Sequence, residues 1–141
     1  MAESGARVIQ IEPVEGAPGR FIGPFPDDQP DPNKCLDYWW YNTGKESAAI
    51  DYTRTPGAEF VRDLVSKADV FVESTRPGTL KQYGLDYETL SAANPGLIYL
   101  SFTDFGQDGP WVEFEMNDHA HLALGGPMGS RDRKSTRLNS S

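Results

Sequence analysis

Short apolar runs alternate with segments of helical period through most of this chain. Residues 7–12, 47–52, 69–73 and 97–102 are rich in β-branched or other apolar side chains and predict four strands. Residues 55–68, 79–83 and 86–93 predict helices between the last three strands. Strands and helices in this order predict an α/β fold, a Rossmann-like parallel sheet with flanking helices and right-handed crossovers.

Local signals sharpen this prediction at three places. Thr55 followed by Pro56 predicts a helix that has Thr55 as its N-cap and Pro56 at its first position. The run 69–73 is almost continuously apolar, which predicts a strand buried on both faces of the sheet. Residues 13–33 are rich in Pro, Gly and Asp and therefore predict a long loop.

Composition limits the classes of partner. The chain has 141 residues and a formal net charge of −8, and its last eleven residues carry four of the basic side chains. The remaining body is therefore strongly acidic, which argues against nucleic acid or an anionic membrane as partner. No apolar stretch is long enough to span a bilayer, and the N-terminus has no secretory signal pattern, so we expect a cytoplasmic protein.

The residues that usually bind metals or nucleotides form no recognisable motif here. Cys35 is the single cysteine and is expected to be a packing residue. His119 and His121 lie two positions apart, which suits neither one helical face nor a metal site, so we predict no metal site. The sequence also has no Gly-rich dinucleotide fingerprint and no Walker loop, which leaves NAD and ATP without support.

The segment most indicative of function runs from residue 101 to residue 118, SFTDFGQDGPWVEFEMND. An apolar strand ends there in a Gly-rich turn, and Asp118 follows where a helical rhythm resumes. In α/β folds, side chains beyond the carboxyl end of a strand commonly form the active site. Asp118 is therefore a candidate functional carboxylate, with a helix N-cap as the structural alternative.

Several cations lie in loops that adjoin predicted strands. Arg20 ends a Gly-Ala-Pro-Gly-Arg turn, Lys45 follows Asn-Thr-Gly, and Arg76 and Lys81 flank Pro77-Gly78. Each side chain taken alone suits a solvated surface charge. In an acidic chain, however, cations that gather near strand ends favour an anionic ligand.

The chain resembles the class III CoA-transferases (the CaiB/BaiF family) from about residue 5 to residue 126, in collinear order. The segments that carry the resemblance are GARVIQIEP, NTGKESAAIDYTRTPG and ADVFVESTRPGTLKQYGLDYETLSAANPGLIYLSFTDFGQDGP, with Asn117-Asp118 after them. The resemblance implies transfer of CoA from an acyl-CoA donor to a small carboxylic acid. Coenzyme A is then a substrate, and no cofactor is bound permanently.

The resemblance also assigns roles to individual residues. It makes Asp118 the nucleophile that attacks the thioester, forming first a mixed anhydride and then an aspartyl-CoA thioester. It places Arg20 and Lys45 near the nucleotide end of CoA. The family's E-N-F-R-P-G motif appears as ESTRPG, so Ser74 and Thr75 replace a CoA-binding Asn and an aromatic residue, and Arg76 keeps the basic position.

The resemblance further implies that the chain is a fragment. Family members are longer, with an N-terminal strand and helix, a second lobe and a flexible glycine loop, and they form interlocked homodimers. Residues 1–130 are expected to be part of the family's large domain. Residues 131–141, RDRKSTRLNSS, are expected to be a disordered or non-native tail that resembles a translated sequencing adapter. The chain by itself is therefore expected to have little or no activity.

Two alternatives remain open from the sequence. The α-methylacyl-CoA racemases resemble this family, share the Asp and the FGQ-GP turn, and move an α-proton with a His and an Asp; His119 or His121 could supply the His. A non-catalytic fragment that at most associates with a partner chain is the other alternative, since exposed apolar surface favours association.

Overall fold

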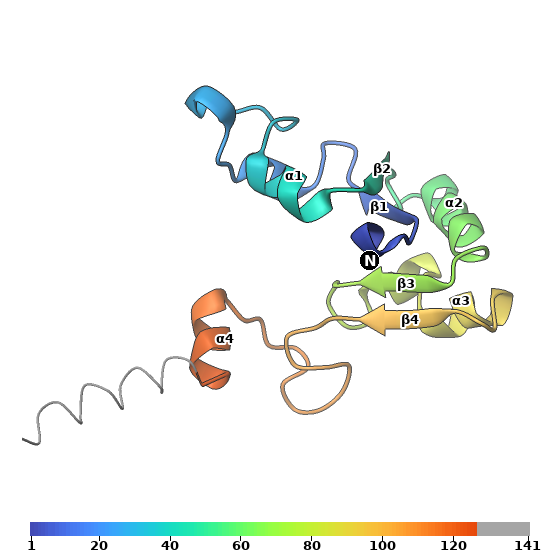
Figure 1. Ribbon diagram of the computed structural model, residues 1–141. Helices are drawn as coiled ribbons and strands as arrows, with labels where there is room; N and C mark the ends of the chain where they lie inside the picture. Colours follow the sequence, from blue (N-terminus) through green and yellow to red (C-terminus); the bar gives the residue numbers. More distant parts are fainter. Residues whose placement is uncertain (127–141) are drawn as a thin grey trace, which may run out of the picture.

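The computed structural model describes residues 1–126, so the tail 131–141 lies outside the described residues. Four strands and four α-helices make up its frame, with short 3₁₀ turns between them (Figure 1). In chain order the elements are η1 (Ala2–Ser4), β1 (Val8–Glu12), η2 (Pro18–Phe21), η3 (Pro26–Asp28), α1 (Leu36–Asn42), β2 (Lys45–Ala49), α2 (Thr55–Val65), β3 (Val70–Glu73), η4 (Thr79–Tyr83), α3 (Tyr87–Ala93), β4 (Ile98–Ser101) and α4 (Asp118–Leu124).

The strands form two parallel pairs. β1 pairs with β2, with Val8 opposite Lys45, and β3 pairs with β4, with Val70 opposite Ile98. Each pair is joined through a helix-containing connection, as parallel strands require. The predicted α/β fold with parallel strands and flanking helices is therefore confirmed, and within residues 1–126 it takes the form of two two-stranded sheets.

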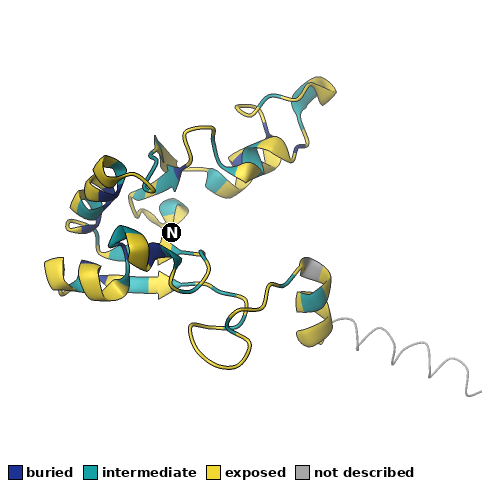
Figure 2. Cartoon of the chain, turned by 180° about the vertical axis from the view of Figure 1, so that it is seen from behind, coloured by how far each residue is buried: buried dark blue, intermediate teal, exposed yellow. Residues whose placement is uncertain are grey.

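The hydrophobic core is formed by α2, η4 and α3, together with the residues that lead into α3 and β4. Its side chains are apolar residues that each retain less than a tenth of their exposed surface, shown dark blue in Figure 2. They are Val61, Val65, Leu80, Leu85, Leu90 and Leu97. Val61 and Val65 are four residues apart on one face of α2, as its amphipathic spacing predicts.

Two element boundaries that differ from the sequence predictions are the start of β2 and the N-cap of α2. β2 covers Lys45–Ala49, two residues earlier than the predicted start at Ser47. The N-cap of α2 is Arg54, and Thr55 is already helical, so the prediction of Thr55 as N-cap was wrong. Pro56 does lie in the first turn, where its missing N–H costs no hydrogen bond.

Helix α1 was not predicted from the sequence. Its segment, LDYWWYN, is short and aromatic, and Tyr38 is its one buried residue. A helix that buries a single position shows no repeating apolar face, so periodicity cannot reveal it. Within the same region Cys35 is fully buried, and its Sγ–H donates to the Gly19 carbonyl at 3.3 Å and the Gly23 carbonyl at 3.5 Å. The expected packing role of Cys35 is confirmed.

One face of the β3–β4 pair is uncovered in the described structure. Val72 on β3 is 47% exposed, and Ile98 on β4 is 62% exposed. The prediction of a β3 strand buried on both faces is therefore wrong for residues 1–126. The side chains of β3 are nonetheless mostly apolar, as is typical of strands that are buried in a parallel sheet.

A single carboxylate anchors the excursion between β1 and β2. Glu12, at the end of β1, is 2% exposed and accepts hydrogen bonds from five groups. The donors are Ala17 N at 2.9 Å, Arg20 Nε at 2.6 Å and Nη2 at 2.8 Å, Tyr38 Oη at 2.7 Å, and Ser47 Oγ at 2.5 Å. Residues from η2, α1 and β2 thus converge on one charged group. The segment 13–33, predicted as a long loop, contains η2 and η3, and the Glu12 network anchors it at Ala17 and Arg20.

Asn94 connects the ends of α2 and α3 and offers a local test of the fold. Its Nδ2 donates to the carbonyls of Val65 at 3.1 Å and Ala68 at 2.8 Å. We expect Asn94→Ala to lower the free energy of unfolding by about 1–3 kcal/mol, because the carbonyls of Val65, the last residue of α2, and of Ala68, three residues further on, both lose the Asn94 amide as a donor. Urea denaturation followed by circular dichroism measures this. Asn33→Ala, at an exposed position, is the control and should leave the urea midpoint unchanged.

Candidate functional site

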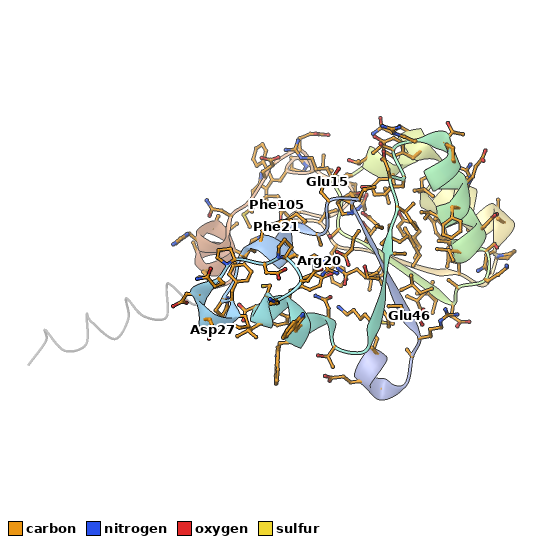
Figure 3. All side chains as sticks on the ribbon, turned by 90° about the horizontal axis from the view of Figure 1, so that it is seen from above. Glu15, Arg20, Phe21, Asp27, Glu46 and Phe105 are labelled. Atoms are coloured by element: carbon orange, nitrogen blue, oxygen red, sulfur yellow. The ribbon has the colours of Figure 1, made fainter. Side chains whose placement is uncertain are left out.

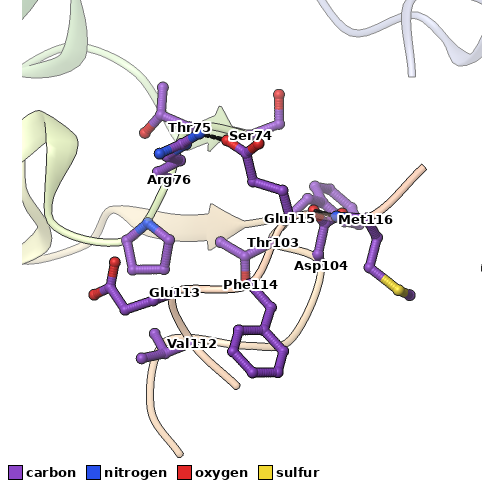
Figure 4. A pocket seen from close by; sticks show the side chains of 12 residues that line it. Ser74, Thr75, Arg76, Thr103, Asp104, Val112, Glu113, Phe114, Glu115 and Met116 are labelled. Carbon is purple, nitrogen blue, oxygen red and sulfur yellow. Dashed lines mark hydrogen bonds and ion pairs between the residues drawn. The ribbon is translucent and has the colours of Figure 1, made fainter. Parts of the chain in front are cut away.

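A groove of about 510 Å³ lies where the chain leaves β3 and β4 (Figure 4). The two strands are parallel, so their carboxyl ends meet at the same edge, the place where α/β folds commonly bind ligands. The loop after β3 supplies one wall and the long segment after β4 supplies the other. The lining residues are Ser74, Thr75, Arg76, Pro77, Phe102, Thr103, Asp104, Val112, Glu113, Phe114, Glu115 and Met116.

Three residues singled out from the sequence line this groove. Ser74, Thr75 and Arg76 are consecutive on the loop after β3, and the segment that they face ends at Met116, two residues before Asp118. The structure therefore brings the ESTRPG segment together with the segment that follows the FGQDGP turn. In the turn, Gly106 has φ +87° and Gly109 has φ +101°, a left-handed region that favours glycine.

Glu73 organises both walls. Its Oε2 accepts from the Thr75 backbone N and from Thr75 Oγ1, each at 2.7 Å, and its Oε1 accepts from Ser101 Oγ. Ser101 Oγ in turn accepts from Gln107 Nε2 at 2.6 Å. One carboxylate at the end of β3 thus fixes the loop after β3 and, through Ser101, the FGQDGP turn. The sequence analysis did not identify Glu73, because a carboxylate at a strand end has no distinctive spacing.

The groove is acidic. Among its lining residues Arg76 is the one cation, whereas Asp104, Glu113 and Glu115 are acids, and Arg76 forms an ion pair with Glu115. A polyphosphate would be repelled by this arrangement. An uncharged part of a ligand, or a group that carries a single negative charge, suits the groove better.

Asp118 is the first residue of α4, and its side chain lies outside the described residues. The N-cap of α4 is Asn117, whose Oδ1 accepts from the Ala120 N–H at 3.0 Å. The N-cap alternative for Asp118 was therefore wrong by one residue. A carboxylate in the first helical turn still interacts favourably with the helix dipole.

Arg20, labelled in Figure 3, does not line the groove. Its guanidinium forms the bidentate pair with Glu12 and stacks over the Tyr38 ring at 4.2 Å from the ring centroid. This pairing raises the pKa of Arg20 and holds the pKa of Glu12 far below its ordinary range. Burial beside Glu12 raises the pKa of Tyr38 to about 12. The charge of Arg20 is thus balanced inside the protein.

Lys45 also lies away from the groove, at the first position of β2. Its side chain is exposed, and its Nζ donates to Asn42 Oδ1 at 2.9 Å. The Asn42 amide oxygen is neutral, so this hydrogen bond brings no negative charge to the ammonium group. Two cations are predicted near the nucleotide end of CoA. Arg20 pairs with the Glu12 carboxylate, whereas the hydrogen-bond partner of Lys45 is neutral and leaves its charge uncompensated.

The sequence model that represents CoA-transferase family III matches residues 1–138 of this chain. The chain belongs to CoA-transferase family III. It is 43% identical over 122 residues to a subunit of succinyl-CoA:(R)-benzylsuccinate CoA-transferase from Thauera aromatica, covering 86% of this chain and 30% of that protein. It is 40% identical over 131 residues to succinate–glutarate CoA-transferase from Agrobacterium fabrum, covering 91% of this chain and 33% of that protein.

A solved structure supports the same membership of CoA-transferase family III. The crystal structure of a CaiB/BaiF family protein from Brucella suis superposes with a TM-score of 0.76 and is 40% identical. That match covers 86% of this chain and 32% of the Brucella protein. The chain thus spans about a third of the length of the family III relatives that it matches.

Two further observations concern the part of this family III chain that the structure describes. Within residues 1–126, none of the helices has the length and apolar content needed to cross a membrane. The same residues contain no group of three or more His, Cys, Asp or Glu side chains that could hold a metal ion.

Proposed function

We propose that the protein transfers CoA from an acyl-CoA donor to a carboxylic acid, and that residues 1–130 form part of its large domain. The observation that carries this proposal is the family match over residues 1–138. The groove supports it, because the ESTRPG segment and the segment leading to Asp118 face each other there. We propose a cytoplasmic location, as the sequence led us to expect, and an interlocked homodimer, as the family resemblance implies.

In the proposed reaction Asp118 is the nucleophile. Its carboxylate attacks the thioester carbonyl, and the C–S bond breaks to give an acyl-aspartyl anhydride and a CoA thiolate. The thiolate then attacks the aspartyl carbonyl and releases the donor acid, leaving an aspartyl-CoA thioester. The acceptor carboxylate attacks this thioester, which forms a second anhydride and releases the CoA thiolate again. The thiolate then attacks the acceptor's acyl carbonyl in this anhydride, which yields the new acyl-CoA and regenerates the Asp118 carboxylate. No oxidant or net proton is consumed.

The charges of the described residues suggest how CoA lies. The acidic groove suits the uncharged pantetheine arm and the thioester, with the Ser74 and Thr75 hydroxyls and the Thr75 loop as polar contacts. The phosphates of the nucleotide end need cations elsewhere. Lys45 suits this role because its charge is uncompensated by its Asn42 partner, and Arg20 serves more through its support of the Glu12 network.

A hybrid enzyme tests the proposal. The segment of Agrobacterium fabrum succinate–glutarate CoA-transferase that matches this chain is replaced by residues 1–126 of this chain. We expect the hybrid to form glutaryl-CoA from succinyl-CoA and glutarate, whereas the 141-residue chain alone forms none. The measurement is chromatographic separation of the two CoA esters after incubation.

The same hybrid separates the alternatives. A racemase-type site would exchange the α-proton of a 2-methylacyl-CoA in deuterated water without any acceptor acid. A hybrid that folds and dimerises like the parent enzyme but catalyses neither reaction would contradict the proposal. That outcome would favour the alternative of a non-catalytic fragment.

A further inference from the structure

We propose that Asp104 is a positioning residue that fixes α4, and with it the backbone of Asp118, relative to the end of β4. Asp104 lies three residues beyond the end of β4 and lines the groove. The effect on catalysis that we infer rests on the proposed function, whereas the contacts themselves do not. Neither the alternation of strands and helices nor the spacing of motifs singles out this residue.

The carboxylate of Asp104 joins two points of the chain that are distant in sequence. Its Oδ2 accepts from the Met116 backbone N–H at 3.0 Å, and its Oδ1 lies 3.0 Å from His121 Nε2. These partners are 12 and 17 residues away along the chain. One side chain therefore links the end of β4 to the segment entering α4 and to the helix itself.

The two contacts enclose Asp118. Met116 precedes it by two residues, and His121 follows it by three, one turn further along α4. Residues three apart on a helix lie on neighbouring positions of its surface. Because the chain is held on both sides, the backbone of Asp118 has a fixed position relative to β4. The Asn117 cap adds a third constraint between these two points.

This geometry determines the tautomer of His121. When the imidazole is neutral, one ring nitrogen carries the proton and the other accepts. A carboxylate oxygen 3.0 Å from Nε2 requires the proton on Nε2, so Nδ1 is the unprotonated nitrogen. The interaction therefore has a spectroscopic signature that does not depend on enzyme activity.

The contribution to global stability should be small. The Asp104 side chain is 38% exposed and that of His121 is 47% exposed, so water screens their interaction. Accurate placement of a reacting group, in contrast, can change rates by about 100-fold for a displacement near 1 Å. Asp104 is therefore expected to affect the placement of α4 more than the unfolding equilibrium.

The structural arm uses the 141-residue chain with ¹⁵N-labelled histidine and backbone. In the wild type, at a pH where the imidazole is neutral, we expect the proton of His121 on Nε2 and slowed hydrogen exchange at the Met116 amide. Asp104→Ala should remove both signals. Asp108→Ala, at an exposed acid in the same turn, is the matched control and should change neither.

A second pair of variants, at His121, tests whether the Nε2–H donor is needed or whether any side chain at this position is sufficient. His121→Gln keeps an Nε2–H donor and should retain the protection of the Met116 amide, whereas His121→Ala should weaken it. A wild-type His121 with its proton on Nδ1, or unchanged exchange at Met116 in Asp104→Ala, would overturn the assigned contacts.

The catalytic arm uses the hybrid enzyme described above. Asp104→Ala should lower kcat for glutaryl-CoA formation by about 10- to 100-fold, with KM for succinyl-CoA within about twofold of the unsubstituted hybrid. An unchanged kcat together with the loss of the Met116 and His121 signals would refute positioning and leave the proposed function intact. If the unsubstituted hybrid transfers no CoA, the proposed function fails, and the structural arm still decides whether Asp104 fixes α4.

Discussion

Replacing Glu12 by Gln lowers the free energy of unfolding by about 3–5 kcal/mol, as expected when one partner of a buried ion pair is removed. The Glu12 carboxylate is 2% exposed and accepts five hydrogen bonds, two of them from Arg20. A Gln amide keeps the shape but leaves the Arg20 guanidinium without its counter-ion. Because small domains are stable by only about 5–15 kcal/mol, this loss is a large fraction of the total.

Urea denaturation of the 141-residue chain measures the effect, with fluorescence of its three tryptophans as the probe. Glu15→Gln is the matched control, since Glu15 is an exposed acid three residues along the same chain. Its urea midpoint should equal that of the wild type. Equal midpoints for Glu12→Gln and Glu15→Gln would show that the Glu12 network contributes nothing to stability.

The difference in free energy of unfolding between the wild type and Glu12→Gln is expected to change with pH in one direction. Hydrogen bonds from Arg20, Ser47, Ala17 and Tyr38 hold the pKa of Glu12 far below its ordinary range. The stabilisation is therefore complete above the pKa of an unfolded glutamate, about 4.3. Below that pH it decreases by about 1.4 kcal/mol per pH unit as the unfolded chain takes up a proton, until the pH reaches the folded pKa. We therefore expect the difference in free energy of unfolding between the wild type and Glu12→Gln to decrease only below about pH 4.3.

Asp118→Asn abolishes CoA transfer by the hybrid enzyme, with a loss in kcat of at least about 10³-fold, if Asp118 is the nucleophile. An amide cannot form the acyl anhydride or the CoA thioester. The covalent intermediate gives a direct measurement. Hydroxylamine converts an aspartyl-CoA thioester into an aspartyl hydroxamate, and peptide mass spectrometry locates the modified residue. We expect the hydroxamate at Asp118 and none in the Asn variant.

The position of Asp118 allows a second role that the same experiment separates. The first turn of α4 also suits a carboxylate that interacts with the helix dipole. Transfer that persists in Asp118→Asn, or a hydroxamate on another carboxylate of the hybrid, would contradict the nucleophile assignment. Asp108→Asn, at an exposed acid outside the groove lining, is the control and should retain the hydroxamate at Asp118.

The sequence predicted those parts of the fold that depend on local periodicity. β1, β3 and β4 occur where apolar runs predict strands, and α2 occurs where apolar residues recur at helical spacing. Helix α3 occurs where the acidic cap Asp86 and the stop at Asn94-Pro95 predict a helix. These signals are local, because burying one face of a strand or helix requires a pattern within the element itself. Helix α1 lacks such a pattern, since only Tyr38 is buried, and the sequence analysis therefore missed it.

The candidate site was predicted in part for the same reason. Ser74, Thr75 and Arg76 follow one strand, and the segments on either side of the FGQDGP turn follow the next, so the parallel order brings both to one groove. Arg20 and Lys45 were grouped with them from their charge, their loop positions and the family resemblance. The structure places Arg20 against Glu12 and Lys45 at the start of β2, away from that groove. Formal charge in a loop does not reveal whether a neighbouring acid already neutralises it.

By itself, therefore, the sequence determined the α/β class, the family and the strand ends where the chemistry is expected. Only the tertiary structure showed which polar groups pair. Glu12 bonds to partners 8, 26 and 35 residues away, and Asp104 bonds to residues 12 and 17 positions away. No periodic pattern encodes such separations. Hydrogen bonds of this kind depend on distances of about 3 Å that exist only after the segments have packed.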